Sequence, residues 1–115
     1  TLSMKEVRMS IPAGKPHRAI PPSEILEDFL GEYGITQYRL AKETKIPHAT
    51  ITRIMKNESR ITAEIAVRLG LYFGNGAEFW ANCQNHYDLY KIILEKGSDI
   101  KKSIIPFENR QMVTV

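Results

Sequence analysis

The side chains with the clearest chemical potential are cations concentrated in one short segment. Residues 36–60 contain six basic and two acidic residues, a net +4 in a chain whose total is +3. The six are Arg39, Lys42, Lys45, Arg53, Lys56 and Arg60. Guanidinium and ammonium groups bind phosphate and carboxylate oxygens. Because residues 24–32 just before them carry four acidic and no basic side chains, we expect faces of opposite sign, with an anionic partner on the basic face.

No pattern typical of catalysis or of a metal centre accompanies these cations. A catalytic site needs a nucleophile with a base, paired carboxylates or a phosphate-cradling glycine loop, and the sequence shows none of them. Acidic residues at the start of a helix are more simply explained by the helix dipole. Cys83 and His86 have metal-ligand spacing, but two ligands without a second pair are a weak signal. We therefore predict no enzyme activity, no metal and no cofactor.

Length and composition indicate one soluble domain. The chain has 115 residues, 43% hydrophobic and 25% charged, which is close to the average for globular proteins. Its single cysteine, Cys83, cannot form an internal disulfide. There is no apolar run of about 18 residues and no apolar stretch of the kind found in secretory signals. We therefore expect a cytoplasmic protein without a membrane segment.

Hydrophobic periodicity predicts five helices that position the basic segment. The predicted helices span about residues 23–33, 36–45, 48–56, 62–73 and 76–96. Thr36 and Thr62 carry oxygens that can cap the second and fourth helices, and Asn75 with Glu78 is typical of a capping box at the fifth. The predicted fold is all-α, with the helical domain at residues 23–96.

Extensions flank this domain at both ends. Prolines and a glycine make residues 1–22 an extended arm, in which residues 7–11 alternate apolar and polar side chains. Residues 97–115 form a C-terminal extension that ends in Met112–Val115, a segment with strand propensity. Because neither segment is stable alone, we expect the arm and the tail to pair as short strands, within the chain or across a dimer.

The fifth predicted helix has a wider apolar arc than a single core contact requires. Its aromatic residues are better explained by packing than by a base-stacking or cofactor platform, because they recur at helical spacing. We predict that this helix supplies a dimer interface, with burial inside the same chain as the alternative. The candidate contacts are Trp80, Cys83, Tyr87, Tyr90 and Leu94.

The second and third helices are short, are joined by a short turn, and leave the outer face of the third polar. This arrangement is typical of a helix-turn-helix unit, whose second helix enters the DNA major groove. Residues 34–62 read GITQYRLAKETKIPHATITRIMKNESRIT. They resemble the lambdoid phage repressors and, more closely, the HigA-type antitoxins. The closer resemblance also includes the Pro-Pro-Ser-Glu-Ile-Leu start of the first helix, Arg60-Ile61-Thr62, Glu78-Phe79-Trp80 and Tyr87-Asp88-Leu89, and covers roughly residues 20–96.

The resemblance implies roles for particular residues. It assigns base reading to four positions near the start of the third helix, His48, Ala49, Thr52 and Arg53, of which Arg53 is the strongest candidate because its fork can bond guanine O6 and N7 together. It assigns contacts to the DNA backbone to Thr36, Gln37, Thr50, Lys56, Asn57 and Arg60. Pro47 departs from the family because a serine or threonine usually caps this helix, and Glu58 departs because a glycine usually follows the asparagine.

The expected function is therefore that of a homodimeric repressor that binds double-stranded DNA in its own promoter. Paired recognition helices about 34 Å apart can read a palindrome that one helix cannot. The resemblance also implies an antitoxin role, with a small basic ribonuclease toxin of the HigB type as protein partner. Two alternatives remain open: a stand-alone or phage-type regulator without a toxin, and a protein-interaction module that has lost DNA binding.

Overall fold

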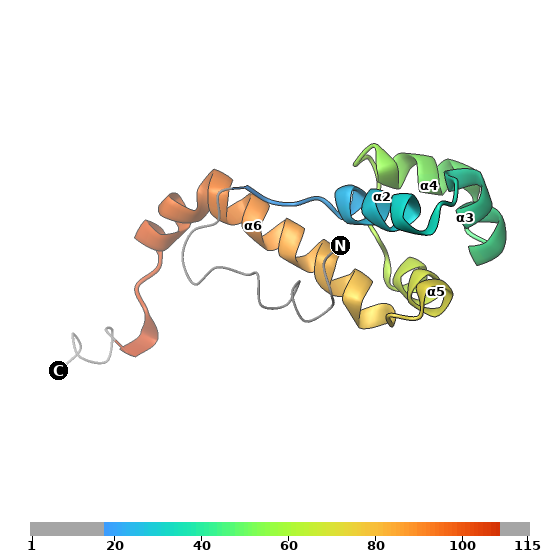
Figure 1. Ribbon diagram of the computed structural model, residues 1–115. Helices are drawn as coiled ribbons and strands as arrows, with labels where there is room; N and C mark the ends of the chain where they lie inside the picture. The colour runs from blue at the N-terminus through green and yellow to red at the C-terminus, as the bar shows by residue number, and fades with distance from the viewer. Residues whose placement is uncertain (1–17, 109–115) are drawn as a thin grey trace.

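A computed structural model, which describes residues 18–108, shows five helices and no strand within that range (Figure 1). The helices are α2 (Pro22–Tyr33), α3 (Gln37–Thr44), α4 (His48–Met55), α5 (Ala63–Phe73) and α6 (Ala77–Ser103). Each begins within one residue of its predicted start, and the all-α prediction is confirmed for the described residues. The strand predictions for residues 7–11 and 112–115 lie outside the described residues, so they stay predictions.

The connection between α3 and α4 is short and sharply turned. Thr36 caps α3, because its side-chain oxygen accepts a hydrogen bond from the Arg39 backbone N–H at 3.0 Å. At the other end Lys45 adopts the left-handed conformation, with φ of 62°, which is common where helices end. Pro47 is the N-cap of α4, and its carbonyl accepts from Thr50 N–H at 2.9 Å. Only three residues therefore separate the two helices.

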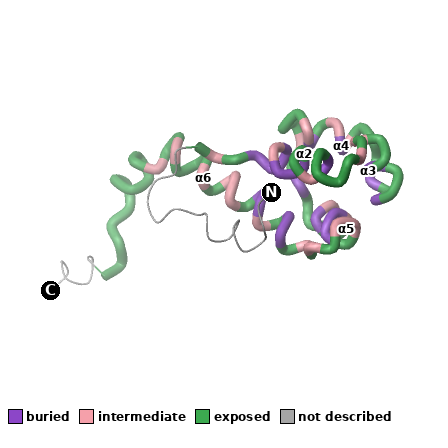
Figure 2. The backbone as a smooth tube through the Cα atoms, viewed as in Figure 1, coloured by how far each residue is buried: buried purple, intermediate pink, exposed green. Residues whose placement is uncertain are grey.

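Each helix contributes at least one fully buried side chain to a single core. These side chains are Leu26, Leu40, Ile51, Ile54, Leu69 and Trp80. The Phe29 ring meets the indole of Trp80 edge-on, with centroids 5.0 Å apart, and Phe73 lies 5.7 Å from the same indole. Figure 2 shows the buried residues gathered where the five helices meet. This core holds α3 and α4 in fixed positions relative to the first turns of α6.

The turn between α5 and α6 differs from the prediction. The N-cap of α6 is Gly76 and makes no side-chain capping bond, so the capping box predicted for Asn75 and Glu78 was wrong. The Asn75 side-chain oxygen instead accepts the indole N–H of Trp80 at 2.9 Å. A buried indole N–H needs an acceptor, and this bond uses the oxygen that the predicted cap required. The same turn lies so close to α5 that a Cβ at Gly70 would stand 2.3 Å from the Gly76 carbonyl carbon.

Helix α6 is longer than predicted. It does not end near Lys96 but continues through Gly97 to Ser103, so residues 97–103 belong to the helix and not to a separate extension. It has 27 residues, or about 40 Å of helix. A single glycine costs a helix only about 1 kcal/mol, too little to end one whose neighbouring residues favour it. Figure 1 shows the second half of α6 extending away from the other four helices.

Candidate nucleic-acid interface

Helix α4 separates its core-facing side chains from those that face solvent. Ile51 and Ile54 are buried. The predicted base-reading residues occupy the opposite side, where His48, Ala49 and Arg53 are exposed and Thr52 is partly exposed. A helix with its side chains is about 10–12 Å wide, which matches a major groove about 12 Å wide. The structure thus brings the four predicted base readers together on one accessible face.

The cations on and just after α4 lack counter-charges within the described part of the chain. Four ion pairs join described residues, and neither Arg53 nor Lys56 takes part in any of them. Both side chains are exposed. A phosphate or a guanine edge can therefore bind them without first breaking an internal ion pair.

The N-terminus of α3 is open to solvent beside this face. Thr36 is exposed and Gln37 is partly exposed, as is Thr50 on the flank of α4. The first N–H groups of a helix have no intrahelical partner and carry partial positive charge, which suits a phosphate. The Thr36 oxygen accepts the capping bond, so its hydroxyl hydrogen remains able to donate.

Tyr38 is a residue of this face that the sequence analysis did not select. The residue is 67% exposed, and its ring meets the His48 imidazole edge-on, with centroids 6.0 Å apart. The contact joins the first turn of α3 to the first residue of α4. Tyr38 and His48 are ten residues apart, and the short turn between α3 and α4 brings their rings together.

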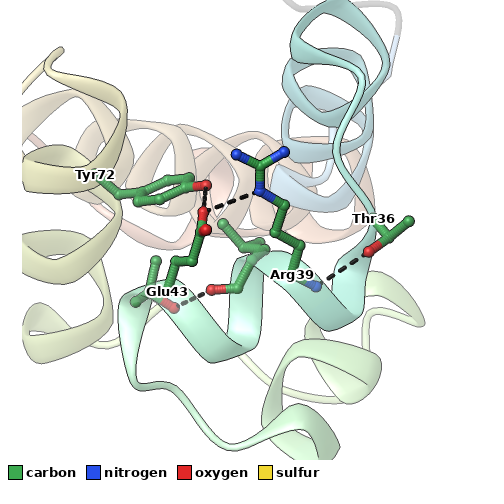
Figure 3. Close-up of polar contacts among 6 residues, drawn as sticks. Thr36, Arg39, Glu43 and Tyr72 are labelled. Atoms are coloured by element: carbon green, nitrogen blue, oxygen red, sulfur yellow. Dashed lines mark hydrogen bonds and ion pairs between the residues drawn. The ribbon is translucent and has the colours of Figure 1, made fainter.

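A polar cluster on the other side of α3 fixes this helix against α5. Figure 3 shows the Glu43 carboxylate between the Arg39 guanidinium and the Tyr72 hydroxyl. Arg39 Nε donates to Glu43 at 3.2 Å, and Arg68 from α5 donates to the Thr44 carbonyl at 3.1 Å. The hydrogen bond from Tyr72 lowers the pKa of Glu43, and the same bond raises the pKa of Tyr72. Arg39 is thus paired within α3, whereas Arg53 makes no ion pair with a residue in the described range 18–108.

The segment after α4 is held by polar contacts that the sequence analysis missed. Asn57 adopts the left-handed conformation, with φ of 61°, and its side-chain oxygen accepts from the Ser23 hydroxyl at 2.7 Å. Arg60 donates to the Asp88 carboxylate of α6 at 2.8 Å. Both had been predicted to contact the DNA backbone, and both remain exposed while making these internal contacts. Partners 34 and 28 residues away give no local signal in a sequence.

The predicted dimer residues separate into two groups. Trp80 and Cys83 are 0% and 2% exposed within the chain's own core, so including them in an intermolecular surface was wrong. Tyr87, Tyr90 and Leu94 are partly exposed. The projecting half of α6 also carries exposed apolar side chains that the sequence analysis did not select, namely Leu89, Ile92, Ile93 and Ile100. The fully buried residues of α6 all lie in its first turns, whereas its second half is mostly exposed.

Other chemistries find no support among the described residues. Residues 18–108 contain no cluster of three or more side chains that could hold a metal ion. Burial raises the pKa of the Cys83 thiol to about 12, the opposite of what a metal ligand or nucleophile requires. No helix in the described range is long and apolar enough to span a membrane.

Comparisons with known proteins agree with this geometry. The family described as helix-turn-helix matches residues 26–80. "Virulence-associated protein I" of Dichelobacter nodosus is 45% identical over 92 residues, which are 78% of this chain and 85% of that protein. An addiction module antidote protein of the HigA family from Coxiella burnetii is 37% identical with a TM-score of 0.76, covering 78% of this chain and 99% of the other. The Pseudomonas aeruginosa antitoxin HigA, solved with the higBA promoter, is 37% identical with a TM-score of 0.73 and coverage of 78% and 99%.

Proposed function

The chain belongs to the HigA family of helix-turn-helix proteins, and on that premise we propose that it represses transcription by binding its own promoter and acts as the antitoxin of a type II pair. The observation that carries the DNA-binding part is the exposed face of α4, where Arg53 has no counter-charge among the described residues. A repressor acts where its promoter DNA lies, which the proposal takes to be the cytoplasm. The proposal contains no catalytic step.

In this proposal, different residues of α3 and α4 contact the bases and the DNA backbone. Arg53 and His48 reach base edges from α4, while Thr36 and Gln37 hold a phosphate at the start of α3. Thr50 and Lys56 flank α4 and contact the backbone on either side. The Tyr38 ring packs against the His48 imidazole and restricts the orientation of its donors towards the groove.

We further propose that two copies associate through the projecting half of α6. This half carries Leu89, Ile92 and Ile93 on its exposed surface, more apolar area than a solitary solvated helix is expected to expose. A dimer supplies the second recognition helix that a palindromic operator requires. Sedimentation of wild type and of Ile93→Glu tests this: the wild type should be a dimer, the variant a monomer, and a variant that stays dimeric contradicts the assignment.

Binding to promoter DNA tests the function directly. The full chain is titrated against a fragment of its own promoter and against an unrelated fragment of equal length, at several salt concentrations. We expect preference for the promoter and a steep loss of affinity with salt, because each neutralised phosphate contributes about −0.9 to the slope of log K against log[salt]. Equal weak binding to both fragments refutes the repressor role while leaving the fold unchanged.

The antitoxin part has its own test. A gene for a small basic protein should lie beside this one, and its product should copurify with this chain. Growth arrest caused by expressing that product alone, and relieved by coexpressing this chain, supports the pairing. A neighbouring protein that neither binds nor inhibits growth favours the stand-alone regulator.

A further inference from the structure

A polar bridge connects α6 to the segment that leaves the recognition helix. Gln84 is 6% exposed, and its side-chain oxygen accepts a hydrogen bond from the Ile61 backbone N–H at 2.8 Å. Its amide nitrogen donates to one carboxylate oxygen of Asp88 at 3.0 Å. The other oxygen of Asp88 accepts from Arg60 at 2.8 Å. Because both ends of Gln84 are fixed, the carboxylate of Asp88 has a defined position beneath Arg60.

The contact that Asp88 makes with Arg60 is a surface contact. The two side chains are 37% and 61% exposed, and one guanidinium nitrogen makes the bond. Exposed pairs of this kind are worth roughly 0–1 kcal/mol. A phosphate can therefore compete with Asp88 for Arg60, at a small cost.

The charges around the pair make that competition meaningful. Glu58 and Lys91 line the same hollow, whose volume is about 310 Å³, so its lining adds one acidic and one basic side chain to the pair. Among the described residues, Asp88 is the carboxylate that forms an ion pair with Arg60, so it offsets part of the positive charge that Arg60 presents to solvent. A carboxylate next to a phosphate contact also repels the phosphate itself.

We propose that Asp88 restrains Arg60 and so lowers the affinity of this protein for DNA, an inference that rests on the proposed DNA-binding function. Arg60 is shared between an internal carboxylate and the DNA backbone. Asp88 lies on α6, the helix to which we also assign the dimer interface. The protein thus binds DNA less tightly than it would if Arg60 were unpaired, and a substitution of Asp88 alone can raise its affinity for DNA.

The test compares Asp88→Asn with Asp99→Asn in the full chain. Asparagine keeps an oxygen that accepts from Gln84 but removes the charge, and Asp99 offers the same charge change about 16 Å further along the helix. We expect Asp88→Asn to tighten promoter binding roughly two- to fivefold at low salt. The slope of log K against log[salt] should steepen by up to about 0.9. Asp99→Asn should change neither quantity, and Arg60→Ala should abolish the effect of Asp88→Asn.

The outcomes separate this inference from the proposed function. If wild type prefers its promoter and Asp88→Asn binds equally or more weakly, Asp88 merely supports the loop and the restraint is refuted. If wild type shows no preference, elution from immobilised heparin still decides: a higher eluting salt for Asp88→Asn than for Asp99→Asn supports the restraint, and equal elution overturns it. Thermal unfolding verifies folding, and Asp88→Ser replaces the asparagine variant if that one is unfolded.

Discussion

Replacing Arg53 with alanine should weaken binding to the promoter far more than binding to unrelated DNA. Arg53 is exposed and makes no ion pair with a described residue, so its loss should change the free energy of unfolding by less than about 0.5 kcal/mol. A bidentate bond to guanine is worth about 1–3 kcal/mol of discrimination, or roughly 5- to 150-fold in affinity. On unrelated DNA the variant loses only the contribution of one charge.

Fluorescence anisotropy with labelled fragments measures this, and Arg53→Lys is the matched control. Lysine keeps the charge and loses the planar fork, so it should retain affinity for unrelated DNA while losing most of the preference for the promoter. A set of promoter fragments with single base-pair changes then locates the pair that Arg53 reads, because there the alanine variant should no longer discriminate. Unchanged affinity and unchanged preference in Arg53→Ala would refute the assigned docking of α4.

Three further predictions concern the scaffold. Gly70→Ala should lower the free energy of unfolding, measured by chemical denaturation, by about 3 kcal/mol, because the added Cβ would collide with the turn before α6. Gly31→Ala is the control: it has open space around it and should raise the free energy of unfolding by about 0.5 kcal/mol. Equal effects of the two substitutions would contradict the close approach at Gly70. Cys83 should resist thiol reagents at pH 8 until denaturant is added, since burial raises its pKa to about 12, and rapid native labelling would show otherwise. The hydrogen bond from Tyr72 lowers the pKa of Glu43, so the stability that this bond contributes is complete above the ordinary carboxyl pKa and is lost as pH falls through the lowered pKa of Glu43. Glu43→Gln should therefore make the free energy of unfolding depend less on pH over that window. An unchanged dependence on pH would count against the bond.

The parts of the fold that local patterns encode could be predicted from the sequence. The starts of α3 and α5 follow from capping chemistry, because the side chains of Thr36 and Thr62 accept backbone hydrogen bonds there. The outward face of α4 follows from the spacing of Ile51 and Ile54, since two buried residues three apart orient the whole helix. The resemblance assigned base reading to four positions of this helix, and the spacing of its buried residues leaves those four positions on the outward side.

Contacts between distant segments could not be predicted in this way. The oxygen of Asn75 had two possible partners, a helix N-terminus and an indole N–H, and only the packing of Trp80 selects the second. The pairing of Arg60 with Asp88 depends on where α6 passes the loop after α4. The sequence shows which side chains can form a hydrogen bond or an ion pair, but the packing of distant segments determines which partner each of them has.

The exposed second half of α6 has a consequence for how promoter occupancy depends on protein concentration. In one isolated copy, residues 89–103 form a mostly exposed helical segment about four turns long, near the length at which isolated helices are only marginally stable in water. Local opening of this segment should cost little free energy, and its amide hydrogens should exchange faster than those of the core. In the proposed dimer, association through this segment orders it, so its protection against exchange should depend on protein concentration. When two chains must assemble on one operator, occupancy rises with the square of the free monomer concentration, and repression begins over a narrower range of protein levels than a monomer would give.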